Sequence, residues 1–93
     1  MLEHRIRELR IARGLSQVEL AKQLGVSKQS LSNWENDNIQ PSIEMLERLA
    51  NCLSVSTDYL LGRDDRRYIE VSGLSDVEVA HIQQIIEDIR KHQ

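Results

Sequence analysis

Residues 17–36 read Q-V-E-L-A-K-Q-L-G-V-S-K-Q-S-L-S-N-W-E-N, and this stretch decides the fold. A first helical pattern, a short turn around Gly25 and a second helical pattern opened by Ser27 give the layout of a helix-turn-helix unit. Gly25 falls where the chain must reverse with a positive φ, a conformation that costs other residues about 1 kcal/mol or more. Ala21 is small enough for the two helices to cross closely. The side chains expected to close the inner side are Leu20, Val26, Leu31 and Trp34.

The helix that follows Ser27 has an outward face of polar side chains without an acid. A polar face is common on any exposed helix, so its meaning here depends on the turn that precedes it. Gln and Asn can pair with adenine through two hydrogen bonds, and Lys can donate to the acceptors of guanine. The first turn of such a helix is the part that enters the major groove of DNA. We therefore expect base reading by Lys28, Gln29, Ser32 and Asn33.

The other helices follow from apolar spacing and from capping residues. Ser16 followed by Glu19 has the spacing of a capping box, and Gly14 and Gly62 are typical helix stops. The sequence predicts an all-α, five-helix domain over residues 1–62. Its expected helices are residues 2–13, 17–24, 28–35 and 43–53 and a short one that includes Tyr59, Leu60 and Leu61.

Beyond this domain we expect a charged linker over residues 63–73 and an amphipathic helix within residues 74–93, capped by Ser75 with Glu78. Burying one Ile is worth about 1.5–3 kcal/mol, so the apolar stripe of this helix is expected to pack on something. A second copy of the chain is the first expectation; the alternatives are residues 1–62 and a different protein. The polar face is not basic, which argues against a membrane. The stripe, our candidate dimerisation surface, consists of Val79, Ile82, Ile85, Ile86 and Ile89.

Within the linker, residues 68–71 have a weak alternation typical of a strand. We expect Tyr68, Ile69 and Val71 to form an edge strand that pairs across the dimer.

Composition and charge narrow the classes of protein. Of the 93 residues, 40% are hydrophobic and 29% are charged, as in an ordered soluble domain. Residues 1–34 carry six basic and three acidic side chains, whereas residues 35–93 carry six and twelve. A basic front end can attract phosphate groups although the net charge is −3.

Several classes of site are not expected. Cys52 is the single cysteine, which excludes an intramolecular disulfide and, with three scattered histidines, a Cys-rich zinc site. We expect no metal, no cofactor and no enzyme, because neither a phosphate-binding glycine loop nor a nucleophile motif occurs. No apolar run follows the first residues, so a cytoplasmic location is expected.

Three motifs in the same order give a resemblance to a known family. They are R-x-x-R-G-L-S-Q-x-E-L-A-x-x-L-G-V-S-x-x-x-L-S-x-W-E-N, P-S-x-x-x-L-x-x-L-A and V-S-x-D-Y-L-L-G, which lie within residues 10–62. The resemblance that they carry covers residues 2–62. The chain resembles the Cro/XRE-type helix-turn-helix regulators, whose DNA-binding domain has the five-helix lambda-repressor-like fold.

The resemblance implies roles for individual positions. Gln17 would anchor a phosphate, and Asn36 would contact the DNA backbone on the far side. We group Ser27, the helix cap, with these backbone positions. Lys28, Gln29 and Asn33 would read base edges, in agreement with the reading of the exposed face. The resemblance also implies that Arg10 pairs with Glu35.

Two positions depart from the family pattern. The loop after Glu35 contains Asp37 and supplies no positive charge, which puts its backbone contacts in doubt. Ser54 stands where the family usually has Gly, so the end of the helix before it is less favourable.

Together these features predict a sequence-specific regulator of transcription that binds double-stranded DNA. A dimeric repressor of bacterial or phage type, bound to an inverted-repeat operator, is the first expectation. The alternative is a DNA-binding antitoxin or regulator whose C-terminal helix binds a different protein.

Overall fold

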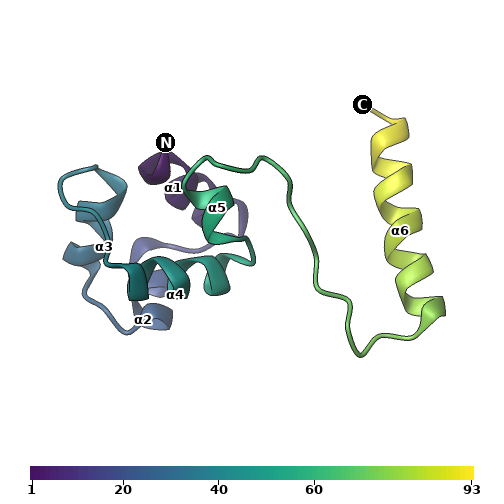
Figure 1. The fold of residues 1–93 in the computed structure, drawn as a ribbon, viewed down its shortest axis with the longest axis horizontal. Coiled ribbons are helices and arrows are strands. Elements are labelled where there is room, and N and C mark those ends of the chain that lie inside the picture. Colours follow the sequence, from purple (N-terminus) through teal and green to yellow (C-terminus); the bar gives the residue numbers. More distant parts are fainter.

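The computed structural model describes residues 1–93 and contains six helices and no strand. Helices α1 to α5 form one compact unit, and α6 stands apart at the end of an extended segment (Figure 1). The all-helical fold class is confirmed. The helices are α1 (Leu2–Ala12), α2 (Gln17–Leu24), α3 (Lys28–Glu35), α4 (Ile43–Leu53), α5 (Thr57–Leu60) and α6 (Asp76–Lys91).

One core of buried apolar side chains holds α1 to α5 together. Every helix of the unit contributes to it, and Trp34 is its one aromatic member. Cys52 packs against this core and is only partly buried. The core residues are Ile6, Leu9, Leu20, Ala21, Leu24, Leu31, Trp34, Leu49, Ala50, Leu53 and Leu60.

Serine hydroxyls begin five of the six helices. Each accepts a hydrogen bond from the backbone N–H three residues later, which satisfies one of the free donors of the first turn. The predicted capping boxes are complete at Ser16 with Glu19 and at Ser75 with Glu78. The remaining serine caps are Ser27, Ser42 and Ser56.

Two helices of the unit end in the left-handed conformation. Gly25 follows α2 with φ 73°, as the turn requires, and Ser54 follows α4 with φ 56°. Ser54 therefore adopts the conformation that the family's usual Gly would adopt without strain. Its N–H still donates to the Asn51 carbonyl oxygen at 3.3 Å, so the helix end is closed in spite of the side chain.

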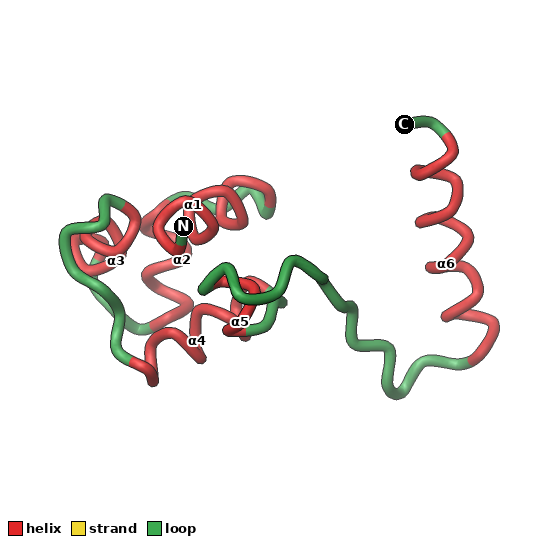
Figure 2. The backbone as a smooth tube through the Cα atoms, turned by 45° about the horizontal axis from the view of Figure 1, so that its top comes forward, coloured by secondary structure: helices red, strands yellow, loops and turns green.

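Helix α6 buries none of its residues. Along its apolar stripe, Ile85 and Ile89 are 58% and 57% exposed, and Val79, Ile82 and Ile86 are half-buried. Both views show the helix away from α1 to α5 (Figures 1 and 2). In this structure α6 therefore does not pack back on residues 1–62, which was one of the alternatives. None of the helices combines the length and the apolar character needed to cross a lipid bilayer.

The expected edge strand is absent from the single chain. Residues 68–71 form no strand, and their backbone groups pair with no other segment apart from a local turn to Leu74. A strand needs a neighbour to supply the ladder of hydrogen bonds, and one copy of the chain offers none here.

Candidate nucleic-acid interface

The helix-turn-helix geometry is set by short contacts around Gly25. The Val26 N–H donates to the Ala21 carbonyl oxygen at 3.0 Å, which closes the end of α2 before Ser27 opens α3. From α4, Arg48 Nη1 donates to the Leu24 carbonyl oxygen at 3.2 Å. Arg48 thus fixes the end of α2 from outside the motif, a role that the sequence pattern did not indicate.

The start of α3 presents an exposed polar face. Lys28 and Gln29 are exposed, while Ser32 and Asn33, one turn later, are half-buried. Gln29 Nε2 donates to Asn33 Oδ1 at 3.0 Å, so these two amides are already oriented relative to each other. The Asn33 amino group and the Gln29 carbonyl oxygen remain available, and together with the Lys28 ammonium they offer two donor groups and one acceptor group.

Glu35, the one acid of α3, is removed from this face. Its side chain is inaccessible to solvent, and its carboxylate accepts hydrogen bonds from Arg10 Nε and Nη2 at 2.8 and 3.0 Å. Gln17 Nε2 donates to the same carboxylate at 3.1 Å. These contacts join α1, α2 and α3 at one buried charge and leave the exposed part of α3 without negative charge.

Arg7 supplies a positive charge that the sequence analysis missed. Its Nη2 donates to the Glu35 carbonyl oxygen and to Asn36 Oδ1, both at 3.0 Å, and its side chain is 41% exposed. The loop after Glu35 carries no basic residue of its own, and Asp37 in it has a positive φ of 59°. The sequence did hold a signal for Arg7: it lies one turn before Arg10 on the same face of α1, so both side chains could be expected near the end of α3.

The three residues expected to contact the DNA backbone already make some hydrogen bonds within the protein. Asn36 Nδ2 donates to Ser32 Oγ at 3.2 Å, which links the end of α3 to a candidate base reader. The Ser27 hydroxyl accepts from the Ser30 N–H at 3.1 Å and donates to Ser30 Oγ at 3.0 Å. Gln17 donates to Glu35 through its side-chain amino group, which leaves its side-chain oxygen free. Its backbone N–H lies in the first turn of α2, and the start of a helix favours anions such as phosphate.

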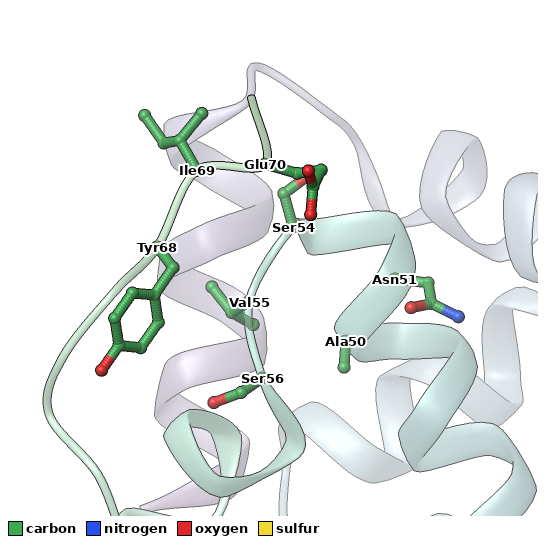
Figure 3. Close-up of a pocket in the computed structure, with 8 residues that line it drawn as sticks. All are labelled: Ala50, Asn51, Ser54, Val55, Ser56, Tyr68, Ile69 and Glu70. Atoms are coloured by element: carbon green, nitrogen blue, oxygen red, sulfur yellow. The ribbon is translucent and has the colours of Figure 1, made fainter. Parts of the chain in front are cut away.

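A separate open pocket of about 510 Å³ lies between the C-terminal end of α4 and the linker. Figure 3 shows Tyr68, Ile69 and Glu70 of the linker beside Ser54 and Val55, with the Ile69 side chain pointing away from them. None of the candidate DNA-contacting residues lines this pocket. No group of three or more His, Cys, Asp or Glu side chains is placed to hold a metal ion.

A family model described as helix-turn-helix matches residues 6–60, which is more than half of the chain. The chain belongs to the Cro/C1-type helix-turn-helix family. The match covers α1 to α5, which include the turn at Gly25 and the polar face of α3. The resemblance found in the sequence motifs is thereby confirmed, and the Cro/C1-type members similar to this chain are named as regulators or repressors of transcription.

Three similar proteins illustrate this family. The transcriptional regulator ImmR of Bacillus subtilis is 42% identical over 64 residues, which are 69% of this chain and 50% of ImmR. The P22 c2 repressor, in a crystal structure with a synthetic operator, is 38% identical with a TM-score of 0.66, over 69% of this chain and 97% of that one. A chain of a SinR protein/SinI protein complex is 30% identical with a TM-score of 0.63, over the full length of both.

The chain spans about half the length of the first curated relatives that it matches. The likeness to the P22 c2 repressor covers only part of this chain, whereas the likeness to the SinR/SinI complex covers all of it and so includes α6.

Proposed function

We propose that this Cro/C1-type chain is a regulator of transcription that binds double-stranded DNA in a sequence-specific manner and acts as a repressor. The observation that carries the proposal is the contrast within α3. Its first turn is exposed, polar and free of acid, whereas its one carboxylate, on Glu35, is buried among donors from α1 and α2. A helix in this state can approach a phosphate-lined groove without repulsion.

In the proposed complex, α3 lies in the major groove. Lys28, Gln29, Ser32 and Asn33 contact base edges, where amide and ammonium groups match the donors and acceptors of purines. Gln17, Ser27 and Asn36 contact the sugar-phosphate backbone and set the register of the domain. Arg7 joins this second group because its partly exposed guanidinium lies against Asn36.

The active form in this proposal is a homodimer formed through α6. One module makes few contacts, and a two-fold dimer doubles them by reading two half-sites about 34 Å apart. The uncovered stripe of α6 supports this form, because five apolar side chains on one face of a helix are unfavourable in water. An operator with an inverted repeat follows from the two-fold symmetry. Bound over a promoter, such a dimer would exclude the transcription machinery.

Selection from random duplex DNA tests this function. The purified chain should enrich one short motif, arranged as an inverted repeat with a fixed separation between its halves. Its affinity for that duplex should fall steeply with salt, in proportion to the phosphates contacted. A chain that enriches no motif, or that binds all duplexes equally, would contradict the proposal.

A second candidate function keeps DNA binding and gives α6 a different protein as its partner. The uncovered stripe is compatible with it, and the likeness that extends through α6 is to a chain from a complex of two named proteins. Sedimentation of the purified chain separates the candidates. A dimer at micromolar concentration supports self-association, whereas a monomer that aggregates or recruits another protein supports the second candidate.

A further inference from the structure

The linker after α5 is fastened to the domain by contacts at Arg5 of α1. Arg5 Nη2 donates to Asp65 Oδ1 at 2.8 Å, and its Nη1 donates to the carbonyl oxygen of Tyr59. The Arg5 guanidinium also lies 4.1 Å from the centre of the Tyr59 ring. Its side chain is only 16% exposed, so Arg5 is a fixed point to which the linker attaches.

Arg67, two residues after Asp65, returns to the same ring. Its guanidinium carbon lies 5.4 Å from the centre of the Tyr59 ring, within the range of a cation–π contact. We call Arg5, Tyr59, Asp65 and Arg67 the linker clasp.

Past Arg67 the linker is held far less. Tyr68 and Ile69 are 64% and 69% exposed, and no hydrogen bond or ion pair joins residues 68–74 to α1–α5. The clasp therefore divides the linker into a fastened part, residues 63–67, and a tether, residues 68–74.

We propose that the linker clasp sets the length of the tether and thereby the half-site separation that the dimer accepts. This inference rests on the function proposed above, with α6 as the dimerisation helix. An extended chain spans at most about 3.5 Å per residue, so residues 68–74 reach about 25 Å and residues 63–74 about 42 Å. Opening both clasps would add at most about 34 Å in total, which is about one helical turn of DNA.

The linker itself provides a matched control for the test. Asp64 accepts from Arg66 Nε at 3.1 Å and from the Arg66 N–H at 2.9 Å, so this neighbouring pair bonds only within the linker. Replacing Asp65 and Arg67 by Ala opens the clasp, and replacing Asp64 and Arg66 by Ala does not. Both double variants remove one acid and one base from the same segment, and both leave Arg5 and Tyr59 in place.

The experiment compares two labelled duplexes. One carries the inverted repeat selected by the parent chain, and the other carries the same halves moved apart by one helical turn. The parent and the Asp64→Ala/Arg66→Ala control should bind the longer duplex much more weakly than the selected one. The parent must open two clasps to reach the longer duplex, and each opening should weaken that binding roughly fivefold. The Kd for the longer duplex divided by the Kd for the selected one should therefore be roughly 5- to 25-fold smaller for Asp65→Ala/Arg67→Ala than for the parent.

Equal ratios for the parent and the clasp variant would overturn the inference while leaving DNA binding intact. The same conclusion would follow if the control variant changed as much as the clasp variant, or if the parent bound both duplexes equally. Binding of the selected duplex by all three chains shows that the variants are folded. A parent that selects no duplex would contradict the proposed function itself, and this inference with it.

Discussion

Arg10 and Glu35 form a two-point ion pair between α1 and the last turn of α3, with Nε and Nη2 donating to the two carboxylate oxygens at 2.8 and 3.0 Å. Arg10 Nη1 also donates to the Leu15 carbonyl oxygen at 2.9 Å, where the chain passes from α1 to α2. One side chain thus fixes both the turn into the helix-turn-helix unit and the far end of its second helix. The pair therefore helps to hold α3 against α1.

Arg10→Met should destabilise the domain by about 3 kcal/mol, because it leaves the buried Glu35 carboxylate without its main partner. Urea unfolding followed by circular dichroism measures the loss. Arg66→Met is the control: its side chain is 78% exposed in the ion pair with Asp64, and the substitution should change stability by less than about 0.5 kcal/mol. Similar losses in the two variants would mean that the buried pair has no special weight.

The proposed base readers should act at separate positions of the operator. Lys28→Ala, Gln29→Ala and Asn33→Ala should each cost about 1–3 kcal/mol at one base pair and relax the preference there. Gln29 donates to Asn33, so the double variant should lose less than the sum of the single ones. Gln17→Ala should weaken binding to all sequences nearly equally. Binding to single-base variants of the selected duplex gives these values, and a uniform loss from the α3 variants would contradict base reading.

Ser54→Gly should stabilise the domain by about 0.5–1 kcal/mol, because Ser54 adopts a left-handed conformation that Gly adopts without strain. In a domain of this size the Tm should rise by about 4–8 °C per kcal/mol. Gly25→Ala should have the opposite effect and lower the Tm, because it places a side chain in a left-handed conformation. The added Cβ would meet only Arg48 Nη1 at 4.0 Å, so the loss comes from the backbone conformation and not from a steric clash. A lower Tm for Ser54→Gly would show that the Ser54 side chain stabilises the domain by more than its left-handed conformation costs.

The uncovered stripe of α6 gives a prediction about assembly. Ile82→Asp places a charge in the centre of the stripe and should convert a dimer into monomers, because a buried unpaired carboxylate is strongly unfavourable. Ala80→Asp, on the opposite and exposed face of α6, should leave the dimer intact. Sedimentation velocity at several concentrations distinguishes the two, and equal behaviour of both variants would exclude the stripe as the interface.

The capping box of α6 should respond to acid. The Ser75 N–H donates to the Glu78 carboxylate at 2.8 Å and lowers the pKa of this carboxyl below its ordinary value of 4.5. Since the folded pKa is the lower one, the contribution is complete above pH 4.5 and is lost as the pH falls through the folded pKa. The chemical shift of the Ser75 amide proton should follow this titration. In Glu78→Gln, whose amide oxygen accepts at every pH, the shift should stay constant.

Much of the fold could be predicted because its signals are local. Serines before apolar repeats marked the helix starts, and Gly25 marked the turn, since these choices depend on a few neighbouring backbone groups. The edge strand expected at residues 68–71 does not form in the single chain, because alternation of side chains cannot supply the partner that a strand requires. Its pairing across a dimer stays a prediction.

The site was predicted less completely because several of its contacts join distant parts of the chain. Arg7 meets Asn36 across 29 positions, and Arg48 meets Leu24 across 24. Such pairs are fixed by how helices pack, which periodicity in one segment does not encode. Gln17 is a further example. The family pattern indicates a phosphate contact for it, but its hydrogen bond to Glu35 follows from helix packing and was not predicted.

Helix α6 has a thermodynamic consequence. A solitary helix of 16 residues that buries nothing is marginal in water, so in the proposed dimer its folding and its pairing form a single equilibrium. Dilution would then melt the C-terminal helix while α1 to α5 keep their core. In the proposed dimer, the concentration of the protein would therefore set how much of the chain can bind two half-sites at once.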